Sequence, residues 1–238
     1  MLIVNADDWG ADATTTDSIA TCLSLRTVSA VSGMVFMQDS ARAAAIARER
    51  GIDVGLHLNF TTAFSGDDVP ATLRDRQQTL TAFLRSHRLA QTVFHPGLVR
   101  TFEYVVAAQI DEYRRLYSSN PARYDGHHHM HLCANVLLQR LLPPQARVRR
   151  SFSFGPGDKG LINRLYRRGI DGFLRRARYR LTDYFFHLAP IGAARLGTIA
   201  RLAREHVVEV ETHPADAREY QFLTGGTIFE QLGLEQHT

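Results

Sequence analysis

The chain has 238 residues, of which 45% are hydrophobic and 22% are charged, and its formal net charge is +4. These proportions are ordinary for a soluble globular protein, and we expect one domain over residues 1–238. The chain has no apolar run long enough to span a membrane and no charged start followed by a long apolar core, so we expect no transmembrane segment, no signal peptide and a cytoplasmic location.

Short apolar runs bounded by turn residues predict strands, and the stretches between them predict helices. In the first half of the chain the expected order is strand 2–6, helix 14–25, strand 28–36, a helix capped by Asp39 or Ser40 and closed by Gly51, and strand 52–60. Residues 61–78 show little periodicity, which predicts a long loop on the substrate side. Helices are expected at 79–87 and 98–117, and Asn120-Pro121 ends the second of them.

In the second half, a strand that begins at Arg123 runs into Asp125-Gly126-His127-His128-His129-Met130-His131. The expected order continues with helix 135–142, strand 146–150, an irregular loop at 151–160, helix 161–179, strand 183–188, helix 193–205, strand 207–211 and a short helical tail. Strands that alternate with helices predict a mostly parallel sheet, here of about seven strands. We expect an α/β fold of the TIM-barrel-like (βα) type, distorted or seven-stranded. The alternative is an open doubly wound sheet.

The excess positive charge is carried by arginine and concentrated between Arg147 and Arg180. A basic segment can bind nucleic acid, but no recognised nucleic-acid motif accompanies this one. We therefore expect a solvated helix face and no nucleic-acid partner. An anionic or lipid-linked substrate, a membrane, a partner protein or an interface in a homo-oligomer would fit the same segment, and the sequence leaves these alternatives open.

Four of the eleven histidines lie within residues 127–131. Side chains alternate between the two faces of a strand, so a strand here would place His127, His129 and His131 on one face and His128 on the other. One metal ion could then bind one or two of them. Its remaining ligands must come from elsewhere in the chain.

The unusual polar residues all fall at the carboxyl ends of predicted strands. Asp7 and Asp8 follow the first strand, His57 lies near the end of the third, His127 follows the middle strand, and His213 follows the last. In βα barrels the active site forms at this face from the ends of different strands. One carboxylate and two imidazoles suit Zn²⁺, Mn²⁺, Co²⁺ or Fe²⁺, whereas Mg²⁺ prefers more oxygen ligands. A second carboxylate and a further histidine would complete the groups needed for metal-assisted hydrolysis.

Four motifs carry a resemblance to a known family. They are Asn5-Ala6-Asp7-Asp8-Trp9-Gly10, Gly55-Leu56-His57-Leu58-Asn59, the segment from Asp125 to His131, and Thr212-His213-Pro214. In this order they resemble the YdjC-like carbohydrate deacetylases, a family that includes chitooligosaccharide deacetylases and deacetylases associated with hopanoid biosynthesis.

The resemblance implies a TIM-barrel-like fold and removal of the acetyl group from an N-acetylated sugar. It implies one divalent metal ion, Mg²⁺ or Zn²⁺ with Mn²⁺ and Co²⁺ as alternatives, bound by Asp8, His57 and His127. It also implies that Asp7 is the general base and His213 the general acid. The expected partner is a small N-acetylated sugar or a glycolipid.

Four further residues are candidates for substrate binding. Trp9 either stacks on a sugar ring or packs at the barrel mouth, and Asn59 either lines the site or caps the end of its strand. His129 would form a wall of the site, and Arg150, or its neighbour Arg149, would orient it.

Two other functions compete with deacetylation. Sets of Asp and His at barrel mouths also serve metal-dependent phosphoesterases. A non-catalytic sugar-binding barrel is the third alternative, although a binding protein has little need of both a base and an acid.

Overall fold

Parallel strands alternate with helices along the chain. The computed structural model describes residues 1–153 and 160–226, so Gly155-Pro156-Gly157 of the expected loop and the end of the expected helical tail lie outside the described residues. Within these ranges seven strands form one sheet in the order β5-β4-β3-β2-β1-β7-β6. The strands are β1 (Leu2–Trp9), β2 (Ala30–Gly33), β3 (Val54–Leu58), β4 (Arg123–Gly126), β5 (Arg147–Val148), β6 (Tyr184–His187) and β7 (Val208–Thr212).

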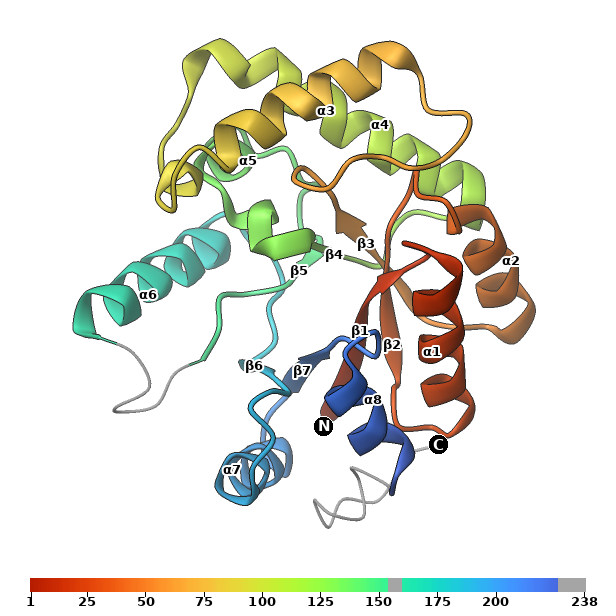
Figure 1. Cartoon of the computed structure of the whole chain (residues 1–238). Coiled ribbons are helices and arrows are strands. Elements are labelled where there is room, and N and C mark those ends of the chain that lie inside the picture. Colours follow the sequence, from red (N-terminus) through yellow and green to blue (C-terminus); the bar gives the residue numbers. More distant parts are fainter. Residues whose placement is uncertain (154–159, 227–238) are drawn as a thin grey trace.

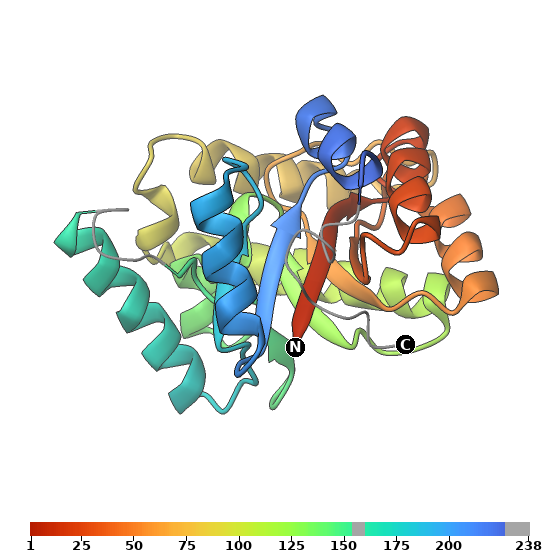
Figure 2. The same cartoon turned by 90° about the horizontal axis from the view of Figure 1, so that it is seen from below.

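The sheet curls into a barrel-like shape (Figures 1 and 2). Its strands wind in one direction, and the parallel pairing of β1 with β7 joins the first strand to the last. A doubly wound sheet would reverse its strand order at a switch point, and this sheet does not. The edge strands β5 and β6 approach each other where an isolated bridge joins Arg147 and Arg180. The expected barrel-like, seven-stranded fold is therefore confirmed, while the described residues do not form the eight-stranded closure of a strict TIM barrel.

The helices lie around the outside of the curled sheet (Figure 1). They are α1 (Ala13–Ser24), α2 (Ser40–Arg50), α3 (Ala71–Leu84), α4 (Val99–Tyr117), α5 (Ala134–Leu138), α6 (Leu161–Arg176), α7 (Ala193–Ala203) and α8 (Ala217–Thr224). Gly51 closes α2 in the left-handed conformation, as expected. The loop expected at 61–78 is wrong in its second half, because α3 already begins at Ala71. None of the helices in the described parts of the chain combines the length and the apolar character needed to cross a bilayer.

The basic helix expected at 161–179 forms as α6 and packs lightly on the barrel. It buries only Asp171 and Leu174, whereas Leu161 and Ile162 near its start are exposed. Asp171 accepts hydrogen bonds from the Arg150 guanidinium, and this pair ties α6 to the segment that follows β5.

The strand expected to run through the histidine cluster is wrong. β4 ends at Gly126, where a side chain would meet the backbone of His131 and Leu58 at 3.0 and 3.1 Å. A 3₁₀ segment (His127–Leu132) follows, and within it His128 and His129 have positive φ angles of 54° and 57°. The chain therefore turns sharply in place of alternating its side chains between two faces.

The inside of the curled sheet is polar. Along β7 the side chains of Glu209 and Glu211 are buried, and Arg149, which follows β5, lies within ion-pair distance of both. On neighbouring strands Asn5 donates a hydrogen bond to Ser32. The apolar side chains of the same strands, such as those of Val4, Val208 and Val210, belong to the hydrophobic core.

The hydrophobic core predicts a measurable difference between two leucines. Leu56 on β3 is fully buried, whereas the side chain of Leu138 is 59% exposed. We expect Leu56→Ala to lower the free energy of unfolding by about 2–5 kcal/mol, because it removes apolar contacts and leaves a cavity. We expect Leu138→Ala to change it by no more than about 0.5 kcal/mol. Urea unfolding of both variants measures the difference, and equal effects would contradict the assignment of β3 to the core.

Candidate active site

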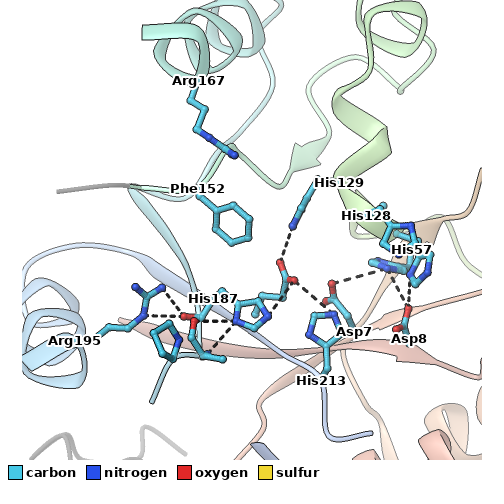
Figure 3. A pocket seen from close by; sticks show the side chains of 15 residues that line it. Asp7, Asp8, His57, His128, His129, Phe152, Arg167, His187, Arg195 and His213 are labelled. Atoms are coloured by element: carbon cyan, nitrogen blue, oxygen red, sulfur yellow. Dashed lines mark hydrogen bonds and ion pairs between the residues drawn. The ribbon is translucent and has the colours of Figure 1, made fainter. Parts of the chain in front are cut away.

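A pocket of about 770 Å³ opens at the carboxyl ends of the strands. It is lined by Asp7, Asp8, His57, His127, His128, His129, Phe152, Arg167, His187, Arg195, Glu211 and His213, among others (Figure 3). Residues that are far apart in the sequence meet here because parallel strands present their carboxyl ends at one edge of the sheet.

The two adjacent aspartates point into the same pocket because the backbone of β1 is irregular. The pairing register between β1 and β2 shifts between Ala6 and Trp9, which marks a bulge, and Asp8 has a positive φ of 67°. Neighbouring side chains on a regular strand would point to opposite faces. The bulge redirects one of them, and a non-glycine residue with positive φ carries backbone strain of the kind found at functional sites.

Asp8, His57 and His127 converge on one wall of the pocket. Asp8 Oδ1 lies 2.9 Å from His127 Nδ1 and 3.4 Å from His57 Nε2. Each residue offers one atom that could bind a metal ion, and these three atoms lie within 4.8 Å of one another. Burial alone would raise the pKa of Asp8, but its hydrogen bonds with His127 and His57 outweigh burial and hold the pKa below its usual range. The three residues that the sequence suggested as ligands are therefore brought together.

A buried carboxylate orients His57. The Nδ1–H group of His57 donates to Asp125 Oδ1 over 2.8 Å, and Ser32 donates to the other oxygen of Asp125 over 2.5 Å. This leaves His57 Nε2 facing the pocket. Burial would lower the pKa of His57, but the carboxylates of Asp7, Asp125 and Asp8 outweigh it and raise the pKa well above its usual value. The wall thus concentrates negative charge around a histidine nitrogen.

Arg149, inside the curled sheet, binds the carboxylate of Asp7. The guanidinium donates to both carboxylate oxygens, over 2.6 and 2.8 Å, and Asn5 donates a third hydrogen bond over 2.8 Å. The side chain of Asp7 is only 2% exposed, and its Oδ2 lies 3.9 Å from His57 Nε2. Its orientation is therefore fixed beside the wall formed by Asp8, His57 and His127.

The opposite wall carries a second group of histidines around Glu211. His213 Nε2 lies 3.6 Å from Glu211 Oε1, and His187 Nε2 lies 4.0 Å from the same oxygen. His129 Nε2 lies 3.5 Å from Glu211 Oε2. Burial, followed by the negative charge of Asp7, raises the pKa of Glu211 well above its usual value. Figure 3 shows His187 and His213 side by side, with Asp7 between them and His57.

The structure separates the four candidate substrate contacts. His129 lines the pocket and packs edge-on against Phe152. Trp9 is fully buried, so its ring has no surface on which a sugar could stack. Asn59 is also fully buried and accepts hydrogen bonds from the backbone of the loop that follows it, which is the capping role. Arg150 pairs with Asp171 and is not among the residues that line the pocket, whereas Arg149 contacts Asp7.

Three charged or polar residues of the site were not predicted from the sequence. Asp125 stood within a recognised motif without a role, Glu211 was treated only as part of a strand, and His187, near the end of another strand, was not proposed as a ligand. One signal was available. Residues 207–211 read Val-Val-Glu-Val-Glu, and two glutamates inside such an apolar strand indicate a polar interior that must be compensated elsewhere.

One family model matches nearly the whole chain, and two known proteins are similar to it. A family model described as YdjC-like protein matches residues 1–232. A carbohydrate deacetylase from Xenopus laevis is 27% identical over 139 residues, which is 57% of this chain and 44% of that protein. The crystal structure of a candidate cellobiose-phosphate cleavage protein from Enterococcus faecalis V583 superposes with a TM-score of 0.67 at 18% identity, over 100% of this chain and 96% of the other. At that identity the superposition shows a shared fold.

The buried charges below the pocket predict a strong and pH-dependent effect of Arg149. Arg149→Met leaves the carboxylates of Asp7 and Asp125 without their cation, and we expect the free energy of unfolding to fall by about 3–5 kcal/mol at pH 7. Burial alone would raise the pKa of Asp125, but the positive charge of Arg149 and the interaction with His57 outweigh burial and hold this pKa below its usual range. The stabilisation is therefore present above the unfolded pKa of about 3.9 and disappears as the pH falls further, so the deficit of the variant should shrink below about pH 4.

Urea unfolding of the chelator-treated proteins at pH 7 and below about pH 4 measures how far Arg149→Met lowers the free energy of unfolding. Arg114→Met is the matched control, because its partner Asp111 is exposed and such pairs contribute only about 0–1 kcal/mol. An Arg149→Met protein as stable as the control would contradict the central role of this guanidinium.

Proposed function

The chain belongs to the YdjC-like protein family, and on that premise we propose that it is a metal-dependent hydrolase that removes the N-acetyl group from an N-acetylated amino sugar or glycoconjugate and releases acetate. The observation that carries this proposal is the convergence of Asp8, His57 and His127 on one wall of a pocket that also contains Asp7 and His213. A ligand triad, a carboxylate and a further histidine are the groups that metal-assisted hydrolysis of an amide uses.

The chemistry of the first wall fits a divalent cation. Two imidazoles and one carboxylate with room for further ligands match the composition of catalytic zinc sites, and Mn²⁺ and Co²⁺ accept the same donors. The hydrogen bond from His57 to Asp125 is the outer support that metal-binding histidines usually have. When bound, such a cation supplies Lewis acidity towards the amide carbonyl and increases the acidity of water.

Asp7 is the general base of this proposal. Arg149 and Asn5 fix its carboxylate in one orientation beside the metal-binding wall. In the proposed reaction Asp7 accepts a proton from the water that attacks the acetyl carbon. The new carbon–oxygen bond forms as this proton leaves the water.

His213, on the other side of the pocket, is the general acid of this proposal. Its Nε2 lies 3.6 Å from Glu211 Oε1, and its side chain lines the same pocket as Asp7. In the proposed reaction His213 gives its proton to the amine as the carbon–nitrogen bond breaks. Acetate and a free amino sugar are then released. His129 would contact the substrate from the rim of the same pocket.

Release of acetate from N-acetylglucosamine oligomers tests the reaction, with a phosphomonoester as the control substrate. We expect acetate and no phosphate. Asp7→Asn should lower kcat by about 10²–10⁴-fold, because general-base catalysis contributes that much, while the protein keeps its metal. An Asp7→Asn protein with near-normal turnover would refute the assignment of the base, and release of phosphate without acetate would refute the reaction.

Metal analysis tests the ligands separately from catalysis. We expect His57→Ala and Asp8→Ala to lose the bound cation on dialysis. Asp125→Asn should retain it with affinity about 10–100-fold weaker, because Asp125 orients His57 without being a ligand. His87→Ala, which changes an exposed histidine outside the pocket, is the control. Equal metal contents in all four variants would contradict the proposed site.

A further inference from the structure

A second set of metal-binding side chains lies across the pocket from the first. His187 is the last residue of β6, Glu211 lies on β7, and His213 directly follows β7. One donor atom from each lies within 4.8 Å of the other two. The two sets share no residue, so both can be filled in the same molecule.

Glu211 gives an independent reason to expect a ligand here. Its side chain is only 4% exposed and it lines the pocket. Its Oε2 has no hydrogen-bond partner among the residues that the structure describes, because His129 and Arg149 approach it no closer than 3.5 and 3.6 Å. The oxygen that faces His187 and His213 is Oε1, so a cation held by both carboxylate oxygens would be needed to give Oε2 a partner. Such a cation would remove the cost of a buried oxygen without a hydrogen bond, about 1–3 kcal/mol or more when charged.

Neighbouring groups hold both histidines close to Glu211. His187 Nδ1 lies 3.0 Å from the backbone nitrogen of Ala189 and 3.1 Å from its carbonyl oxygen. The tautomer that donates to the carbonyl leaves a lone pair on Nε2, and a cation bound there would select this tautomer. The backbone N–H of His213 donates to Glu219 Oε2 over 2.9 Å, which fixes the start of the segment after β7. Glu219 Oε1 lies 3.8 Å from His187 Nε2 and is available as a fourth ligand.

We propose that His187, Glu211 and His213 form a second site for a divalent cation, and that a cation bound there inhibits the enzyme. Two imidazoles and a carboxylate favour Zn²⁺ over Mg²⁺. A cation coordinated by His213 Nε2 occupies the lone pair that must carry the proton for the leaving amine. Binding at this site stands on the geometry alone, and inhibition rests on the proposed function.

Zinc titration of metal-depleted protein tests the second site. By isothermal calorimetry and by zinc content after gel filtration, we expect wild-type protein to bind two equivalents. The His187→Ala protein should bind one equivalent tightly. Its affinity for the second equivalent should be about tenfold or more lower than that of the wild type, because a ligand has been removed. His57→Ala should lose the first event and keep the second, and His87→Ala should behave as wild type. A wild-type protein that binds one equivalent, or a His187→Ala protein that binds two unchanged, would overturn the proposal.

Acetate release at rising Zn²⁺ concentration tests the inhibitory role. We expect the wild-type rate to fall over the concentration range in which the second equivalent binds, and the rate of His187→Ala to stay level over that range. Two bound equivalents with an undiminished rate would overturn the inhibitory role. If no variant releases acetate, the proposed function has failed, and the zinc stoichiometry still decides whether the second site exists.

Discussion

The guanidinium of Arg149 inside the curled sheet is the interaction on which the rest of the site depends. It contacts Asp7, Asp125 and Glu209 directly and approaches Glu211 at 3.6 Å. Carboxylates buried together repel one another, and each loses several kcal/mol of hydration, so those that stay charged need a cation close by. Arg149 therefore permits a polar barrel interior. Through Asp7 on one side and Asp125 behind His57 on the other, it also sets the positions of groups that face the pocket.

Irregular backbone conformations direct further side chains into the pocket. Asp8, His128 and His129 all have positive φ angles at the ends of their strands. A regular strand end would turn about half of these side chains away from the pocket, because neighbours alternate. The strained residues put two adjacent aspartates, and three adjacent histidines, on one surface. The strain is tolerated because well-packed strands on both sides hold these turns in place.

The sequence predicted the parts of the site that follow from strand ends, and missed those that follow from strain or long-range charge. Asp7, Asp8, His57, His127 and His213 meet as expected, because parallel strands end at one edge. The alternation assumed for the histidine cluster failed, since nothing in the residue types shows that β4 stops at Gly126. Arg149 and Arg150 could not be distinguished from the sequence, because no pattern shows which of two adjacent side chains after a two-residue strand faces the interior of the sheet. Glu211 is a ligand candidate only because strands far apart in the chain enclose it.

The pairing of β1 with β7 has a consequence for how the protein reaches this state. β1 lies between β2 and β7, and the amino group of Met1 donates a hydrogen bond to the carbonyl of His206. Contacts this distant in sequence slow folding, because a long loop must close before they form. During synthesis β1 can pair with β2 early, but its other edge has no partner until β7 has been synthesised. Asp7 thus stays on an open edge until the last strand arrives, and the two walls of the pocket are joined in a late step of folding.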